Sequence, residues 1–173
     1  LVFSGVLSSE ISRGTLINLL TKGLSRQAVI LAKYSAMLLV WSLSILLPAA
    51  LTWVYTMYLF PKDHLGVGYL LFAISCMWLF GAFLLALLLS SATLVQGNYG
   101  SLLLTGLMVV LLMALNIIPS IKEYNPVSVA SKTMELAAGK IDPSSVYTAV
   151  EITAVASLGL IALAVIVFRK KRL

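Results

Sequence analysis

Side chains able to carry out acid–base, nucleophilic or metal chemistry are few in this chain and far apart. The single histidine, His64, follows Lys62 and Asp63 in the short polar turn "PKDHLG", a setting typical of a solvated side chain. The single cysteine, Cys76, excludes an intramolecular disulfide and a cysteine-based zinc site. Because catalysis needs such groups clustered in one place, this scatter indicates a protein that is not an enzyme.

The remaining candidates for chemistry also lack partners in the sequence. The pair Gly139–Lys140 matches only the end of a phosphate-binding G-x-x-x-x-G-K-[ST] loop, without the upstream glycine or the following hydroxyl. Thr105 and Asn116 have no base nearby. Four methionines could be soft-metal ligands, but packing in apolar helices is their commoner role: Met37, Met77, Met108 and Met113. We therefore predict no catalytic residue, no cofactor site and no metal site.

The elements that carry these residues are unusually apolar. The 173 residues are 61% hydrophobic and 10% charged, with a mean hydropathy of +1.05. Soluble domains have about 25% charged residues, because a compact fold needs a polar surface. Lipid is therefore the predicted solvent. The net charge of +6 does not indicate nucleic acid, since the basic residues cluster at the ends of apolar spans and form no basic face with interleaved aromatics.

Four apolar stretches reach the roughly 20 residues that a membrane crossing requires. They predict an all-α, polytopic transmembrane helix bundle forming a single membrane domain, 1–173. The predicted spans are 28–60, 67–89, 101–118 and 149–168. Residues 1–9 are too short to cross, and we interpret them as the tail of a truncated transmembrane helix. Residues 119–148 are predicted to be an extracytoplasmic loop with two turn signals, "YNPVS" and "GKIDPSS".

The basic residues predict the orientation of these spans. One group precedes the first predicted span: Arg13, Lys22, Arg26 and Lys33. Another follows the last: Arg169, Lys170, Lys171 and Arg172. An even number of crossings, four, lies between the two groups, so both groups lie on the same side of the membrane. The positive-inside rule predicts that this side is the cytoplasm. We therefore predict a multi-pass protein of the cytoplasmic (plasma) membrane with a cytoplasmic C-terminus.

Within the spans, small side chains and one proline are the features that predict helix geometry. Small residues four apart allow close helix–helix packing in lipid, although such stripes also arise by chance in helices rich in Leu and Ala. The two stripes are Ala82, Ala86 and Ser90, and Ala149, Thr153 and Ser157. Pro48 predicts a kink in the first span, because proline removes one hydrogen bond of the helix.

The stretch "SSEISRGTLINLLTKGLSRQAVILAKY" (8–34) holds five of the eighteen charged side chains. On a helical projection one arc is apolar: Leu16, Ile17, Leu19, Leu20 and Leu24. The opposite arc is polar or small: Gly14, Asn18, Thr21, Lys22 and Ser25. This pattern predicts an amphipathic helix lying along the cytoplasmic interface and stopping near Gly23. An anchor that binds anionic lipid would explain the amphipathicity and the basic residues. It would not explain Glu10 or the Gly14–Thr15 pair.

At these residues the chain resembles the first cytoplasmic loop of ABC-2 type transporter permeases. In that family the loop reads as an acid, then "GT", then "LL", then a short break followed by "SR" and a lysine entering the next span. The corresponding words here are "EISRGTLINLLTKGLSRQAVILAK". Gly23 stands where the family often has proline. The order of spans and turns is also similar over essentially the whole chain, and the family's six spans imply that further spans lie upstream of Leu1.

The resemblance implies a permease subunit of an ATP-binding cassette transporter, with export as the family's commoner direction. Residues 10–27 would form the cytoplasmic coupling region against a separate ABC ATPase subunit, which binds the ATP. The implied interface residues are Glu10, Arg13, Gly14, Thr15, Leu16, Leu19, Leu20, Arg26 and Lys33. The other implied partners are the lipid bilayer and a second permease copy or a paired permease.

Two other functions stay open at this point: an ATP-independent channel or secondary transporter subunit, and a purely structural membrane subunit. Ion-coupled carriers usually have charged residues near the midplane or paired broken helices, and Pro48 is a single break without a partner. Co-purification with a cytoplasmic ATPase would distinguish the permease subunit of an ABC transporter from both of these alternatives. The nearly uncharged spans favour an apolar or amphipathic substrate.

Overall fold

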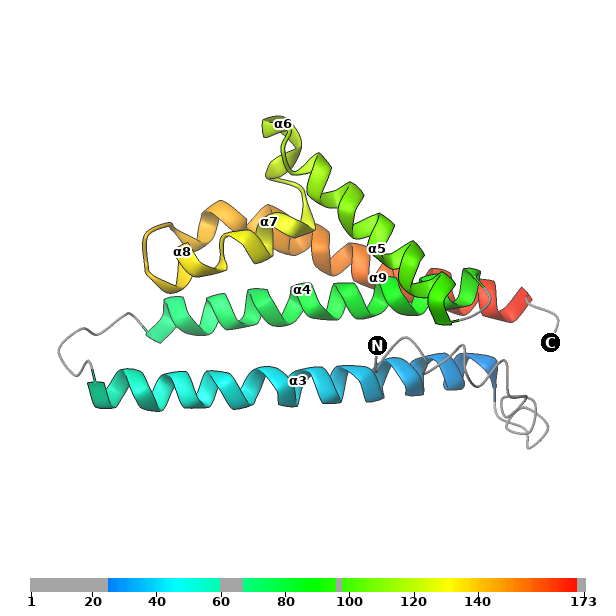
Figure 1. The fold of residues 1–173 in the computed structure, drawn as a ribbon, viewed down its shortest axis with the longest axis horizontal. Helices are drawn as coiled ribbons and strands as arrows, with labels where there is room; N and C mark the ends of the chain where they lie inside the picture. Colours follow the sequence, from blue (N-terminus) through cyan, green and yellow to red (C-terminus); the bar gives the residue numbers. More distant parts are fainter. Residues whose placement is uncertain (1–24, 60–66, 96–97, 171–173) are drawn as a thin grey trace. The chain divides into compact units, whose positions relative to one another are not determined.

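The computed structural model of the chain describes residues 25–59, 67–95 and 98–170. All regular structure in these ranges is helical and none of it is β-strand, which confirms the predicted all-α class for this part of the chain. The elements are α3 (Arg26–Leu59), α4 (Val67–Leu94), α5 (Asn98–Leu115), α6 (Pro119–Lys122), α7 (Pro126–Ser131), α8 (Thr133–Ala137), the 3₁₀ helix η1 (Pro143–Val146) and α9 (Tyr147–Lys170) (Figure 1). The predicted amphipathic coupling helix and the tail 1–9 lie outside the described residues.

Three of the described helical segments are long and apolar enough to cross a membrane: Gln27–Leu59, Gly68–Leu94 and Pro143–Arg169. Leucine, alanine and methionine, which are strong helix formers, dominate α4. In lipid an α-helix also satisfies its own backbone hydrogen bonds, so apolar composition and helical structure go together. These three helices are compatible with insertion into a membrane.

The helix at the predicted third span, 101–118, is shifted along the chain. This helix, α5, has the predicted length of 18 residues, but it begins at Asn98 and ends three residues early, at Leu115. The cause is Pro119, which disfavours helical geometry in the residue before it: Ile118 is extended, with φ −80° and ψ 116°. At 1.5 Å per residue α5 is about 27 Å long, against a hydrocarbon core of about 30 Å. The described residues thus contain three long apolar helices and one shorter apolar helix, and the membrane crossing at 101–118 stays a prediction. The predicted orientation stays a prediction.

The segment 119–148, predicted to be a loop, is largely helical. It contains α6, α7, α8 and η1, and two of these begin at the predicted turn signals. The Asn125 side chain caps α7 by accepting a hydrogen bond from the Val127 N–H at 3.0 Å. Asp142 lies directly before the proline that opens η1. Gly139 has φ 64°, the left-handed conformation that glycine adopts readily after a helix end.

The chain divides into two compact units, each built from stretches that are far apart in the sequence. Among the described residues, the first unit comprises 25–38, 83–95, 98–111 and 155–170. The second unit comprises 39–59, 67–82 and 112–154. The helices α3, α4, α5 and α9 each contribute residues to both units.

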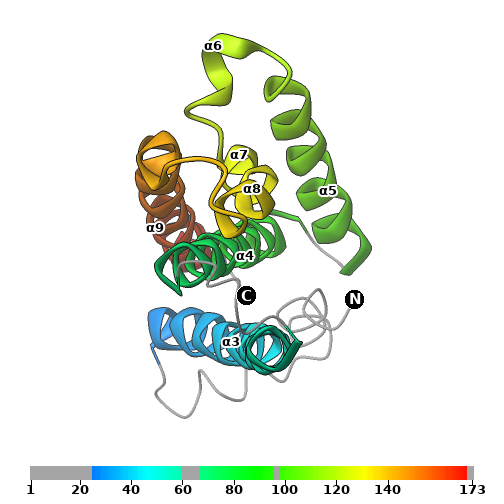
Figure 2. The ribbon, with the colours of Figure 1, turned by 90° about the vertical axis from the view of Figure 1, so that its left-hand side faces the viewer.

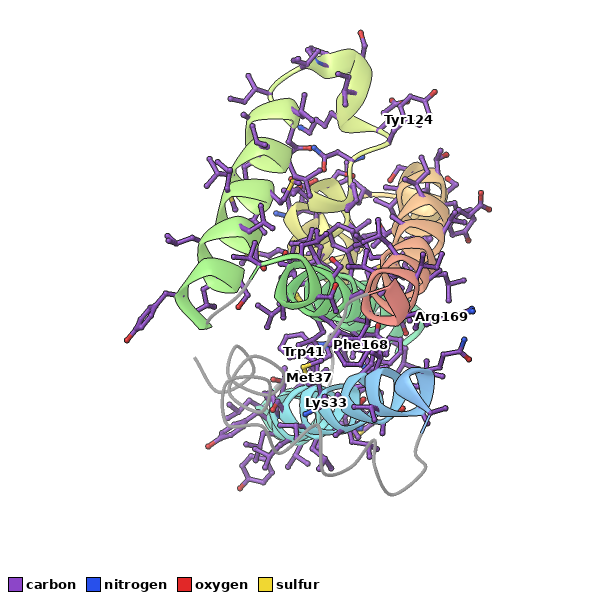
Figure 3. The ribbon with its side chains drawn as sticks, turned by 90° about the vertical axis from the view of Figure 1, so that its right-hand side faces the viewer. Lys33, Met37, Trp41, Tyr124, Phe168 and Arg169 are labelled. Atoms are coloured by element: carbon purple, nitrogen blue, oxygen red, sulfur yellow. The ribbon has the colours of Figure 1, made fainter. Side chains whose placement is uncertain are left out.

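In the first unit the buried apolar side chains come from α3, α4 and α9, and α5 contributes the buried Ser101. Ile30, Tyr34 and Met37 are spaced four and three residues apart on α3, so they share one face, and all three are buried. On α9, Phe168 is fully buried. Figure 3 shows the Phe168 side chain directed from α9 toward α3, where Met37 and Lys33 lie. An apolar core therefore forms close to the basic ends of these helices.

In the second unit a small apolar core joins the short helices to α4 and α9. Its buried members are Ala73, Cys76, Val129, Leu136, Val146 and Ala149. At its edge Phe72 and Tyr147 meet edge-to-face, with ring centroids 5.8 Å apart. Figure 2 shows α7 and α8 lying beside α4. The segment after α5 is thus held by packing, as a folded part of its unit.

Candidate functional site

The predicted ATPase-coupling interface is described at its C-terminal edge only. Arg26 begins α3, and Lys33 lies two turns further along the same helix. The other seven predicted residues lie outside the described residues: Glu10, Arg13, Gly14, Thr15, Leu16, Leu19 and Leu20. The structure therefore bears on how the coupling region enters the first long helix.

Ser25 lies directly before the first residue of that helix. Its hydroxyl accepts a hydrogen bond from the Ala28 N–H at 3.2 Å, and its carbonyl accepts one from the Val29 N–H at 3.2 Å. The first turn of a helix has N–H groups without helical partners, and a serine side chain satisfies one of them. On the helical projection Ser25 belongs to the polar arc of the predicted amphipathic segment. In the structure it is instead the N-cap of α3. A serine directly before an apolar helical run was the signal for this role.

Replacing Ser25 with alanine is expected to destabilise the start of α3 by about 1 kcal/mol, because the Ala28 N–H loses its acceptor. Hydrogen exchange at Ala28 and Val29 should accelerate, while exchange in the middle of α3 should not change. Ser25→Asp is the matched control, since a carboxylate also caps a helix. Equal exchange in both variants would show that the hydroxyl does not hold this turn.

Basic side chains border the apolar core of the first unit. Lys33 is partly buried on α3, and Arg169 is exposed at the end of α9 (Figure 3). A lysine can bury its aliphatic stem and keep its ammonium in water. This combination suits a position at a membrane surface or against an acidic partner.

In the second unit a tryptophan pair links α3 to α4. The Trp41 Nε1–H donates to the Trp78 carbonyl at 3.1 Å, and the Trp78 Nε1–H donates to Ser42 Oγ at 2.9 Å. Gly81 completes the arrangement, because a Cβ at this position would overlap the Trp41 indole. An indole N–H in an apolar environment needs an acceptor, and here each ring finds one on the other helix.

None of Trp41, Trp78 and Gly81 belongs to a site or motif predicted from the sequence. The available signal was two tryptophans well inside predicted spans, away from the ends where aromatic residues usually gather. The glycine three residues after Trp78 was a second signal, because small residues allow helices to approach closely in lipid.

Pro48 lies inside α3, which runs without interruption from Arg26 to Leu59. Hydroxyl groups on both sides of the proline bond to backbone carbonyls. Ser44 Oγ donates to the Val40 carbonyl at 2.8 Å, and Thr52 Oγ1 donates to the Pro48 carbonyl at 2.8 Å. Such side-chain bonds satisfy polar groups around a proline within an apolar helix. The kink itself stays a prediction.

All six residues of the small-residue stripes are buried: Ala82, Ala86, Ser90, Ala149, Thr153 and Ser157. Two of their hydroxyls bond within their own helix, Thr153 Oγ1 to the Ala149 carbonyl at 2.6 Å and Ser90 Oγ to the Leu87 carbonyl at 2.9 Å. Because these hydroxyls bond within their own helices, the surface that each stripe presents to neighbouring side chains consists of small and largely apolar groups. The hydroxyl residues Ser91 and Thr93 further along α4 are buried as well. The helix itself continues to Leu94, five residues beyond the end of the predicted span at 89.

Groups that could bind a metal ion do not gather anywhere in the described part of the chain. No three His, Cys, Asp or Glu side chains there could share a metal ion. One buried side-chain oxygen, Asn116 Oδ1, has no hydrogen-bond partner among the described residues. No Asp, Glu, Lys or Arg occurs in the sequence between Asp63 and Lys122, so Asn116 lies within an uncharged stretch of the chain.

No protein-family model, no curated protein and no solved structure matches this chain. The part of the chain that the structure describes defines an all-helical class of protein, with three helices there long and apolar enough to cross a membrane.

Proposed function

We propose that the chain is the permease subunit of an ABC-2 type ATP-binding cassette transporter. It forms the membrane path and couples ATP hydrolysis by a separate ATPase subunit to translocation of a substrate, with export as the direction. The observation that carries the proposal is the spacing of Glu10, Gly14–Thr15, Leu19–Leu20, Arg26 and Lys33. This spacing resembles the coupling loop of the family.

The start of α3 supports the proposed coupling. A coupling region transmits force only if it joins a rigid element, and Ser25 caps a helix of 34 residues that begins at the very next position. Movement of residues 10–27 by an ATPase closing around ATP would displace the first turn of α3 directly. Long helices respond to such displacements by rigid-body shifts or tilts.

The proposed path requires a second permease, either another copy or a paired subunit, because a few helices cannot enclose a translocation route alone. The chain would lie in the cytoplasmic membrane with residues 10–27 and its C-terminus in the cytoplasm. The basic residues support this side, since Arg26 and Lys33 lie at the start of α3 and Arg169 and Lys170 at the end of α9.

A pair of neighbouring substitutions tests the coupling. Leu20→Ala removes a side chain from the predicted apolar arc, whereas Thr21→Ala changes the opposite arc of the same segment. We expect Leu20→Ala to weaken association with the ATPase by about tenfold or more, since truncating an apolar anchor of an interface costs on the order of 2 kcal/mol. Thr21→Ala should have no such effect. Co-purification from membranes and transport-coupled ATPase activity in proteoliposomes are the measurements.

The ATPase used is the one whose gene lies beside that of the permease. If the two proteins do not co-purify, or if Glu10→Ala and Leu20→Ala leave both association and ATPase activity as in the wild type, the proposed coupling role is wrong. Translocation that continues without any ATPase would favour a channel or secondary transporter instead.

A further inference from the structure

Directly after α5 the chain makes a bend that presents large apolar side chains outward. We call Asn116–Tyr124 the α5–α6 bend. Ile117 is 81% exposed, and Ile118, Ile121 and Tyr124 are also exposed. Figure 3 shows the Tyr124 side chain projecting away from the helices. Three exposed isoleucines within five residues are unusual for a turn in water, where polar residues and glycine predominate.

The bend continues the uncharged part of the sequence beyond the end of the helix. No Asp, Glu, Lys or Arg occurs between Asp63 and Lys122. The α5 helix ends at Leu115, but the uncharged run continues to Ile121. The exposed apolar face of the last turn of α5, at Met113 and Leu115, therefore continues onto the bend without a polar break.

The backbone of the bend is hydrogen-bonded with little need for water. The N–H groups of Asn116, Ile117, Ile118, Ile121, Lys122, Glu123, Tyr124 and Asn125 all donate to backbone carbonyls within the segment 112–122. Pro119 has no N–H to satisfy. An irregular turn in water can leave such groups to the solvent, whereas in or near hydrocarbon each unpaired group costs several kcal/mol.

A side chain from beyond the bend also caps the end of α5. Asn125 is 3% exposed, and its Nδ2 donates to the Leu112 carbonyl at 2.6 Å. The Leu112 carbonyl also accepts the helical bond from the Asn116 N–H at 3.0 Å, so the amide adds a second bond to it from thirteen residues away. This buried bond ties the segment after the bend to the last turn of α5 and satisfies an Asn125 amide donor without water.

From these observations we infer that the α5–α6 bend binds the bilayer itself, at the boundary between headgroups and acyl chains. Ile117, Ile118 and Ile121 enter the acyl region, and Lys122 and Glu123 mark the headgroup level. Tyr124 takes the interfacial position that tyrosine favours. With α5 about 27 Å long, the bend supplies the apolar surface that the short helix lacks. The inference depends on membrane insertion and not on the proposed ATPase partner.

Spin labels at single cysteines test this inference in the full chain reconstituted into phosphatidylcholine–phosphatidylglycerol vesicles. The background is C76A, because Cys76 is the only cysteine. Labels at Ile117→Cys and Ile121→Cys are compared with a lipid reference, Met113→Cys, and an aqueous reference, Ser144→Cys in η1. All four positions are exposed in the chain, so the substitutions leave the core intact. Collision rates with oxygen, which concentrates in lipid, and with a water-soluble nickel chelate report the depth of each label.

The expected result is a loss of collisions with the nickel chelate at 117 and 121 relative to 144, with oxygen collisions approaching those at 113. Chelate collisions at 117 and 121 equal to those at 144 would place the bend in water and overturn the inference. Protection from both reagents would also overturn it, because protein and not lipid would then cover the isoleucines.

Discussion

Gly81→Ala is expected to lower the free energy of unfolding by about 2 kcal/mol, even though alanine is the better helix former by about 1 kcal/mol. The added Cβ would overlap the Trp41 indole, which cannot swing aside without losing its hydrogen bond to the Trp78 carbonyl. Overpacking and the loss of the indole donor's partner act in the same direction, and together they outweigh the gain in helix propensity. Unfolding in mixed detergent–SDS micelles, followed by tryptophan fluorescence, measures the change.

Two other glycines provide matched controls for this substitution. A Cβ at Gly106 on α5 or at Gly159 on α9 would meet no atom within 4 Å. Gly106→Ala and Gly159→Ala should therefore be neutral or stabilise the protein by up to about 1 kcal/mol. If all three substitutions change the stability equally, the contact of Gly81 with Trp41 has no energetic role. A double-mutant cycle with Trp41→Leu should show that the two changes are not additive.

Asn125→Asp, tested as a separate variant, is expected to lower the free energy of unfolding by about 3 kcal/mol at neutral pH. The amide makes two bonds: its oxygen accepts from the Val127 N–H, and its Nδ2 donates to the Leu112 carbonyl. An aspartate keeps the first bond but replaces the donor with a carboxylate oxygen facing a carbonyl. The site is 3% exposed, so water cannot compensate for the repulsion. Thermal unfolding of the purified protein measures the loss.

The acid dependence of this variant gives a second readout. Protonation of the introduced carboxyl restores an O–H donor, so acidification should recover part of the lost stability of Asn125→Asp. Asn125→Ala is the control: it loses both bonds, and its instability should not respond to acid in this way. Wild-type stability in the aspartate variant at neutral pH would mean that the bond to Leu112 does not contribute.

The apolar runs of the sequence were enough to predict where helices form. The predicted spans 28–60 and 149–168 agree closely with the helices α3 and α9, because a long run of mostly apolar residues satisfies its backbone in lipid by forming a helix. The end of α5 was predicted less well, since Pro119 shifts Ile118 into extended geometry although Ile118 is itself apolar. Hydropathy follows composition, whereas a helix ends where local backbone geometry requires it.

The amino-acid sequence alone thus determined an all-α protein of apolar helices, because that property sums over many residues and depends little on which of them meet. Only the tertiary structure decided which polar groups find each other. Trp41 bonds to a residue 37 positions away, and Asn125 to one 13 positions away. Such pairs depend on how two helices rotate and approach each other. A single sequence does not encode that rotation in its periodicity, because each of the long helices described is apolar on nearly all sides.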